Sequence, residues 1–289
     1  KSRSTDSVEI DKNASVRRKS EKWMGDKDMI LDKIAADTKL RVNKAKRKIP
    51  FSQMRAMAYE KEKNTGFPFE KMLKEPGMHY ICEVKKASPS KGVIAEEFPY
   101  LEIAKEYEAA GAEAISCLTE PKHFLGKNEY LQEIVKEVTI PVLRKDFTVD
   151  EYMIYEAKVL GASAVLLICA ILDRDTIARY IKICDTLGLS ALVEVHDEME
   201  MQDAIQAGAR VIGVNNRNLK DFTVDIGNSL RLRGQAPEDI LFVAESGIKT
   251  AEDIQALKKA HVNGVLIGET LMRSSDKKKC LQELDADEI

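Results

Sequence analysis

The chain has 289 residues, a length that allows one large domain or two small ones. Hydrophobic residues make up 44% of it, and acidic residues outnumber basic ones by 48 to 45, so net charge does not favour binding to nucleic acid or a membrane. No stretch approaches the roughly 20 apolar residues that span a bilayer, and no secretory signal opens the chain. We therefore expect a globular, cytoplasmic protein without nucleic-acid or membrane partners.

Residues 1–28 combine charges and five serines with almost no aliphatic side chains, so they are too polar to form a core, and we predict a disordered extension. The domain is then expected over residues 29–289. Apolar spacing predicts a helix over 29–48 and a second over about 52–62. The basic residues that end the first helix before Pro50 are ordinary helix punctuation, not a nucleic-acid patch.

From residue 80 onward, short apolar runs alternate with amphipathic helical stretches. Several runs follow a glycine of the kind that ends a helix, as in Gly161-Ala162 and Gly208-Ala209. The runs lack polar alternation, as expected of strands covered on both faces. They lie near residues 80–84, 114–118, 140–143, 164–168, 191–195, 210–214, 240–244 and 264–267. Eight such units predict a (β/α)₈ TIM barrel with an extra N-terminal helical segment, and no G-x-G-x-x-G follows the first run.

Cysteine and histidine spacing indicates neither a disulfide framework nor a metal site. The cysteines lack C-x-x-C spacing, and we predict buried thiols in a reducing compartment. The histidines lack H-E-x-x-H spacing, so we expect no metal. The cysteines are Cys82, Cys117, Cys169, Cys184 and Cys280, and the histidines are His79, His123, His196 and His261.

Polar side chains stand at or near the C-terminal ends of five runs. Because parallel strands end at the same face of a barrel, and unpaired buried charges are costly, we expect these groups to converge on one site. Lysines among carboxylates are suited to proton transfer, although an ion-pair network closing the barrel is the alternative. The residues are Glu83, Lys85, Lys145, Glu194, Asn215, Glu245 and Ser246.

Glycines follow the last two runs, in Ser246-Gly247-Ile248 and Ile267-Gly268-Glu269-Thr270. Such glycines let backbone N–H groups approach a phosphate, which barrels often bind there, although they could merely form tight turns. The loop from Ser88 to Gly92 could be a mobile flap or an ordinary surface loop. Phe124 could line a pocket or the core, and Arg217 could bind a carboxylate or face solvent.

From about Met29 to Arg273, the order and spacing of these strings resemble indole-3-glycerol-phosphate synthase. The matching segments are Glu83-Val84-Lys85-Lys86-Ala87-Ser88-Pro89-Ser90, Pro141-Val142-Leu143-Arg144-Lys145-Asp146-Phe147, Leu192-Val193-Glu194-Val195-His196, Gly213-Val214-Asn215-Asn216-Arg217, Ala244-Glu245-Ser246-Gly247-Ile248 and Leu266-Ile267-Gly268. The resemblance also implies that the two N-terminal helices lie over the barrel mouth.

The resemblance implies ring closure of the phosphosugar 1-(2-carboxyphenylamino)-1-deoxyribulose 5-phosphate in tryptophan biosynthesis, with loss of carbon dioxide and water and without a cofactor. It makes Lys145 the general acid and Glu194 the base. Lys85 would be a second acid, or would contact phosphate or hydroxyl groups. Glu83 would orient a lysine and bind substrate hydroxyls.

The remaining implied contacts hold the substrate. Asn215 and Ser246 would position the intermediate. Backbone groups at Gly247 and Gly268, helped by the Ser88 loop, would bind phosphate. The pocket for the anthranilate end would be formed by Phe124, Leu166 and Arg217. Some relatives have serine where this chain has Glu269, so this carboxylate must turn away and leave only its backbone N–H for the phosphate.

Two other functions compete with the synthase. One is another phosphosugar enzyme, such as a phosphoribosylanthranilate isomerase-like barrel, but Glu83 and Lys85 disfavour the Cys/Asp pair of that chemistry. The other is a non-catalytic scaffold, which the presence of Lys85, Lys145 and Glu194 disfavours. We expect a monomer or a weak homo-oligomer.

Overall fold

The computed structural model describes residues 30–218 and 222–286. The predicted disordered extension, residues 1–28, lies outside the described residues. Within the described part, no helix is long and apolar enough to cross a membrane.

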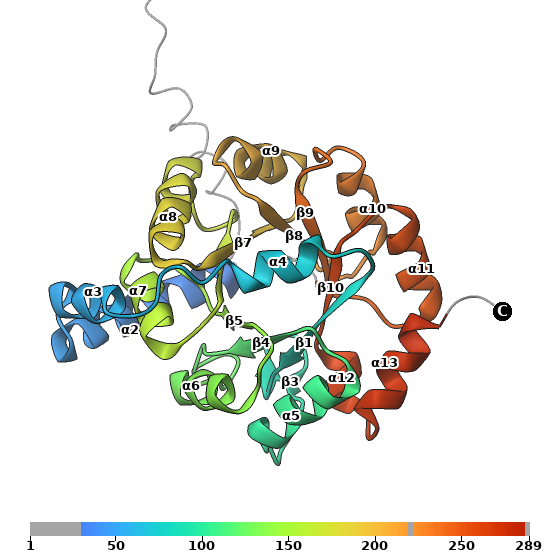
Figure 1. The fold of residues 1–289 in the computed structure, drawn as a ribbon, viewed down its shortest axis with the longest axis horizontal. Coiled ribbons are helices and arrows are strands. Elements are labelled where there is room, and N and C mark those ends of the chain that lie inside the picture. The colour runs from blue at the N-terminus through green and yellow to red at the C-terminus, as the bar shows by residue number, and fades with distance from the viewer. Residues whose placement is uncertain (1–29, 219–221, 287–289) are drawn as a thin grey trace, which may run out of the picture.

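Eight parallel strands form a closed barrel, as predicted (Figure 1). Each strand pairs with its neighbours in chain order, and β1 closes the barrel by pairing with β10. The strands are β1 (His79–Val84), β4 (Ala114–Leu118), β5 (Val142–Lys145), β6 (Ala164–Ile168), β7 (Ser190–Val195), β8 (Val211–Asn215), β9 (Leu241–Glu245) and β10 (Gly264–Ile267).

Helices surround the barrel and follow the strands in the βα order (Figure 1). They are α5 (Tyr100–Ala110), α6 (Asn128–Glu137), α7 (Tyr152–Leu160), α8 (Arg174–Leu187), α9 (Glu198–Gln206), α10 (Gly227–Arg233), α11 (Ala251–Lys259), α12 (Glu269–Arg273) and α13 (Lys277–Asp285). Two end as the sequence predicted: Gly111 and Gly161 adopt the left-handed conformation after α5 and α7. Gly188, which was not predicted, does the same after α8.

Three helices precede the barrel: α2 (Ile30–Lys48), α3 (Phe51–Tyr59) and α4 (Pro68–Lys74). Ile30, Leu31 and Ile34 of α2 line the cavity at the C-terminal ends of the strands. Helix α4 covers the opposite end, where the Leu73 carbonyl accepts a hydrogen bond from the Asn263 side chain. The N-terminal segment therefore reaches both ends of the barrel.

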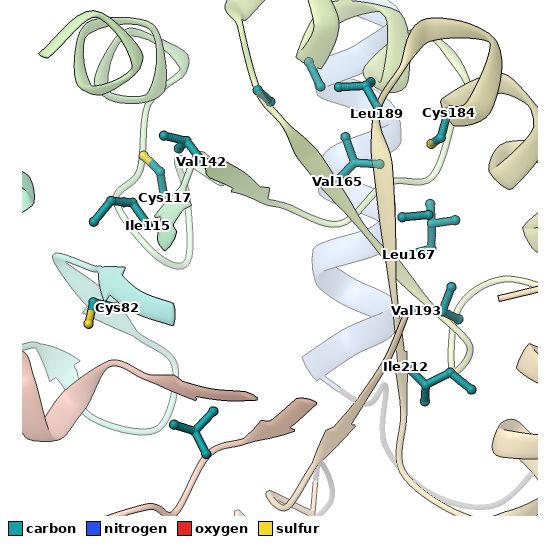
Figure 2. Packing of buried hydrophobic residues seen from close by; sticks show 14 of the residues in the cluster. Cys82, Ile115, Cys117, Val142, Val165, Leu167, Cys184, Leu189, Val193 and Ile212 are labelled. Atoms are coloured by element: carbon teal, nitrogen blue, oxygen red, sulfur yellow. The ribbon is translucent and has the colours of Figure 1, made fainter. Parts of the chain in front are cut away.

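The apolar strand residues divide between two layers. Outward side chains pack between the strands and the helices, and Figure 2 shows Cys82, Ile115, Cys117, Val165 and Leu167 among them. Inward side chains form a second cluster inside the barrel, which includes Ile81, Leu143, Leu166, Leu192 and Val243. Because side chains alternate along a strand, the residue two positions after each of these also points inward, and it lies at the barrel mouth. In β1, β5, β7 and β9 that residue is charged: Glu83, Lys145, Glu194 and Glu245.

Some predictions need correction. The run at 140–143 becomes a strand only at Val142, because Pro141 has no N–H with which to join the ladder. The second helix ends at Tyr59, not near residue 62. Helix α4 and the small hairpin of β2 (Ala87–Ser88) and β3 (Gly92–Val93) were not predicted. The prediction of buried thiols is wrong for Cys169 and Cys280, which are only partly buried.

Candidate active site

A cavity of about 570 Å³ opens at the C-terminal ends of the strands. All fourteen residues that the sequence and the resemblance assigned to the site line this cavity. They are Glu83, Lys85, Ser88, Phe124, Lys145, Leu166, Glu194, Asn215, Arg217, Glu245, Ser246, Gly247, Gly268 and Glu269. The strand ends therefore bring together residues that are far apart in the chain.

Lys145, at the end of β5, lies among carboxylates. Its Nζ is 3.2 Å from Glu245 Oε2 and 3.5 Å from Glu194 Oε2. Burial opposes its charge, but the carboxylates of Glu245, Glu194 and Glu83 outweigh burial and raise the pKa of the ammonium above its ordinary value. Lys145 is therefore a charged group at the wall of the cavity.

Glu245, at the end of β9, is 1% exposed, and neither carboxylate oxygen has a hydrogen-bond partner within the described residues. Burial raises its pKa to about 7, with Lys145 opposing the shift and Glu194 adding to it. A Cβ at Gly213 on β8 would lie 2.1 Å from Glu245 Oε1, so this glycine leaves the space that the carboxylate occupies. Sequence reasoning placed Glu245 at the barrel mouth but gave it no role in the reaction.

Glu83 and Lys85 form an ion pair at the end of β1, with 2.5 Å between Nζ and Oε1. Burial opposes the charge of Glu83, but Lys85 and Lys145 together lower the pKa of its carboxyl. Ser116 on β4 donates to the other oxygen of Glu83 at 3.4 Å. A Cβ at Gly268 would come within 3 Å of both members of the pair, so the glycine after β10 makes room for them.

The turns after β9 and β10 are built for close backbone approach. Ser246 and Gly247 are both left-handed, with φ of 69° and 88°, and the Asn216 side chain holds the Ser246 carbonyl at 3.1 Å. A strained serine next to glycine at this position is typical of a functional turn. The Glu269 carboxylate is paired with cations: its Oε1 lies 3.5 Å from Lys91 and 3.2 Å from Arg273. Lys91 and Arg273 line the same cavity and supply cations that the sequence did not reveal.

The remaining wall of the cavity is apolar. Phe124, from the loop after β4, packs against Phe147 with ring centroids 5.8 Å apart, so it is a wall residue that also extends the core. Leu166 and Ile168 of β6 continue this wall. Arg217 lines the cavity in a half-buried position, where its guanidinium donates weakly to the Phe222 carbonyl at 3.4 Å.

Comparison with known proteins decides between the functions that this geometry allows. A family model described as indole-3-glycerol phosphate synthase matches residues 31–284. The chain belongs to the indole-3-glycerol phosphate synthase family. Its activity is that of this carboxy-lyase of tryptophan biosynthesis, and it takes a phosphosugar substrate. The isomerase-like barrel and the scaffold are therefore set aside.

Relatives within the family are similar over almost their whole length. The indole-3-glycerol phosphate synthase of Ruminiclostridium cellulolyticum is 61% identical over 248 residues, which cover 86% of this chain and 95% of the relative. That of Lachnoclostridium phytofermentans is 53% identical over 267 residues, which cover 89% and 98%.

Solved structures support the fold alone. A 3-hexulose-6-phosphate synthase superposes with a TM-score of 0.59 at 18% identity, covering 72% of this chain and 98% of its own. Thiamine phosphate pyrophosphorylase from Pyrococcus furiosus gives 0.53 at 19% identity, covering 72% and 93%.

In this family member, Asp146 fixes the end of β5 beside Lys145. Asp146 is 1% exposed and accepts two hydrogen bonds from Arg41 of α2, at 2.6 and 2.9 Å, and one from Thr119 at 2.6 Å. Arg144, the largest fully buried side chain, lies 3.6 Å from Asp146 and 2.6 Å from Glu156. Sequence reasoning missed this network, because Arg41 and Arg144 look like ordinary surface charges.

No group of three or more His, Cys, Asp or Glu side chains that could hold a metal ion occurs among residues 30–218 and 222–286.

Proposed function

We propose that the chain converts 1-(2-carboxyphenylamino)-1-deoxyribulose 5-phosphate to indole-3-glycerol phosphate, with Lys145 as general acid and Glu194 as general base. One observation carries the assignment: the charged Lys145 ammonium lies 3.2–3.5 Å from two carboxylates at the mouth of a cavity with an apolar wall on one side and phosphate-type turns on the other.

The first step needs an acid at the ribulose carbonyl. The aromatic carbon that bears the carboxylate attacks the carbonyl carbon, and the carbonyl oxygen takes a proton as negative charge develops on it. Lys145 supplies this proton in our proposal. Loss of carbon dioxide from the same aromatic carbon then restores the ring. The neighbouring carboxylates keep Lys145 protonated before the step, which suits this role.

The second step is dehydration. Glu194 removes a proton from the intermediate, while an acid protonates the departing hydroxyl so that it leaves as water. Lys85 is the second cation at the barrel mouth and serves as this acid, or as a phosphate or hydroxyl contact. Glu83, at 2.5 Å, orients Lys85, and Asn215 and Ser246 position the intermediate.

The two ends of the cavity suggest the direction in which the substrate lies. Backbone groups at Gly247, Gly268 and Glu269, with Ser88 from the opposite loop, suit the phosphate. Phe124 and Leu166 suit the carboxyphenyl ring because they are apolar, and Arg217, which lines the same cavity, suits its carboxylate.

Turnover of the substrate by purified protein, followed by indole fluorescence in the presence of a chelator, tests the proposal. We expect Lys145→Ala and Glu194→Gln each to lower kcat by at least about 10²-fold, since a positioned acid or base contributes roughly 10²–10⁴. The Lys46→Ala variant, which removes a partly exposed pair between α2 and Asp150, serves as the matched lysine control. Near-normal turnover by a folded Lys145→Ala or Glu194→Gln protein would reject the role of that residue.

We also propose that the protein works in the cytoplasm as a monomer or weak homo-oligomer. The burial of Cys82, Cys117 and Cys184 as free thiols is compatible with a reducing compartment. The large apolar side chains that are exposed come from separate elements, such as Leu40 of α2 and Met199 of α9, as expected of a surface without an extensive subunit interface.

A further inference from the structure

His196 follows β7 directly and lies behind Glu194, on the side away from Lys145. The two oxygens of Glu194 face different cationic groups: Oε2 is 3.5 Å from Lys145 Nζ, and Oε1 is 3.5 Å from His196 Nε2. Glu194 lines the cavity, whereas His196 is not among the described residues that do. The imidazole therefore reaches the reaction only through Glu194.

The imidazole is held from its other edge by α9. Its Nδ1 lies 3.0 Å from Glu200 Oε2, and the same oxygen accepts the His196 backbone N–H at 2.8 Å. Glu200 is itself fixed, because its N–H donates to the helix-capping Asp197 side chain at 2.9 Å. Asn228 of α10 donates to the His196 carbonyl at 3.1 Å. Because the backbone and the ring of His196 are both held by these contacts, its Nε2 is directed toward Glu194.

Nε2 is buried and has no hydrogen-bond partner among the residues that the structure describes, although Glu194 Oε1 lies only slightly beyond normal hydrogen-bond distance. A buried ring nitrogen directed at a carboxylate is satisfied most simply when it carries a proton and donates it along that line.

We propose that His196 is a positioning residue for the general base: as an imidazolium it directs an N–H at Oε1 of Glu194, fixes the carboxylate and keeps it ionised between turnovers. The proposal rests on the proposed role of Glu194. In it, Lys145 and His196 hold the two oxygens of one carboxylate from opposite sides. The two neighbouring cations favour the ionised form of Glu194. After Glu194 has removed a proton from the intermediate, they therefore favour release of that proton.

The charges around the ring favour this state. Burial opposes the imidazolium, but hydrogen bonding to Glu200 and the charges of Glu194, Glu200 and Glu245 raise the pKa of His196 above its ordinary value. The Cys169 backbone N–H donates to the Glu194 carbonyl at 3.0 Å, and burial raises the pKa of the Cys169 thiol, so that it stays uncharged. Asn228, which contacts His196 from α10, is neutral.

The pH dependence of kcat/KM for indole formation tests the proposal with His196→Asn. Asparagine keeps an N–H donor but loses the charge. An opposite charge at this distance changes the pKa of a carboxyl by about 1–3 units. We therefore expect the acidic limb of the profile to move up by about one pH unit or more, with roughly a tenfold loss of activity below the limb for each unit. KM should change little, since His196 lies outside the cavity lining.

Two further variants separate charge from packing. Glu200→Gln removes the carboxylate that holds the imidazolium without changing the ring, and should move the acidic limb in the same direction by a smaller amount. His79→Asn is the matched control: it removes another buried histidine paired with a glutamate, at the opposite end of the barrel, and should leave the profile unchanged. If His196→Asn lowers the melting temperature but leaves the limb in place, His196 is merely structural and the proposal is wrong.

Glu194→Gln distinguishes failure of this inference from failure of the proposed function. If Glu194→Gln loses most of kcat, and His196→Asn in that background causes no further loss, His196 acts through the base. If Glu194→Gln loses kcat while His196→Asn alone keeps the wild-type profile, only the inference about His196 fails. If Glu194→Gln is fully active, the assignment of the base fails and the inference fails with it.

Discussion

Glu245 is the residue at which burial and charge oppose each other most strongly. It is 1% exposed and its nearest cation is Lys145 at 3.2 Å, which it shares with Glu194. Burial raises its pKa to about 7, so the native state holds a proton there more tightly than the unfolded chain does. The site therefore contains a carboxylate whose ionisation destabilises the folded protein near neutral pH. Its position beside Lys145 accounts for its presence there.

Replacing Glu245 with glutamine should make stability less dependent on pH. A carboxyl with a raised native pKa contributes stability below its unfolded pKa, near 4.5, and loses that contribution as pH rises through about 7. The neutral glutamine side chain does not titrate, so its contribution to stability does not fall as pH rises. Relative to wild type, Glu245→Gln should therefore gain stability between pH 5 and 8, by up to about 3 kcal/mol for a shift of about 2.5 pKa units. Urea unfolding across this range measures the difference.

Glu83→Gln is the matched control for this experiment. Glu83 is also a buried carboxyl at the barrel mouth, but Lys85 and Lys145 lower its pKa despite burial. Its contribution is present above the unfolded pKa and is lost as pH falls. Glu83→Gln should thus lose stability relative to wild type as pH rises toward the unfolded pKa near 4.5, and the difference should stay constant between pH 5 and 8. A flat difference curve for Glu245→Gln would contradict the raised pKa of Glu245.

At the scale of single elements, α2 is attached to the barrel by several ion pairs, and that of Arg41 reaches the buried Asp146. The two terminal guanidinium nitrogens of Arg41 donate N–H groups to Asp146, next to Lys145, while Leu31 and Ile34 of the same helix line the cavity. The helix that covers the site is thus attached to the strand that carries the proposed acid. Displacement of α2 would affect both the cavity wall and the position of Lys145.

Arg41→Ala should destabilise the fold and lower kcat. Removing one partner of a buried ion pair costs roughly 3–5 kcal/mol when nothing compensates. Thr119 and Arg144 still contact Asp146, so we expect the lower end of that range. Denaturant unfolding and turnover measure the two effects. Lys46→Ala, on the same helix, removes a partly exposed pair with Asp150 and should cost no more than about 1 kcal/mol. Equal costs for the two variants would show that Arg41 does not anchor α2.

The elements also show which features could be read from the sequence. The strands were predictable because apolar runs preceded by helix-ending glycines are local patterns. Helix α4 was not, because its seven residues are too few for a visible period and it begins after Phe67 in a left-handed conformation. Arg144 was missed because a strand arginine looks exposed until its partners, Glu156 and Asn128, are brought to it by the fold.

The site residues also divide into those that local sequence patterns predict and those that depend on contacts made by the fold. Lys145 and Glu194 were predictable because strand ends converge in any barrel, whereas Lys91 and Arg273 depend on how two loops meet. The sequence predicted only that the Glu269 carboxylate turns away from the phosphate. It did not predict the ion pairs of Glu269 with Lys91 and Arg273.

Across the whole molecule, the two ends of the barrel differ in their tasks. The C-terminal end holds the cavity and its interacting charges. The N-terminal end is covered by α4 and fixed by ordinary pairs: His79 with Glu113 at 2.9 Å, and Arg210 with Glu70 at 2.9 Å. In barrels of this kind the first end carries chemistry and the second carries stability. Substitutions at the N-terminal end should therefore change stability without changing the reaction.

His79→Asn tests this separation. The His79 ring lies 2.9 Å from Glu113 and 2.8 Å from the Glu75 carbonyl. Hydrogen bonding to Glu113 raises the pKa of His79 despite the opposing effect of burial. This stabilisation is fully present below the unfolded pKa, near 6.5, and is lost as pH rises through the native value. We expect the variant to lose roughly 1.5–3 kcal/mol at pH 6, less at pH 9, and to keep kcat. Urea unfolding at both pH values, with turnover measured on the same samples, decides the matter: an equal loss at pH 6 and 9 would mean that native His79 is neutral, and a reduced kcat would mean that the two ends of the barrel are coupled.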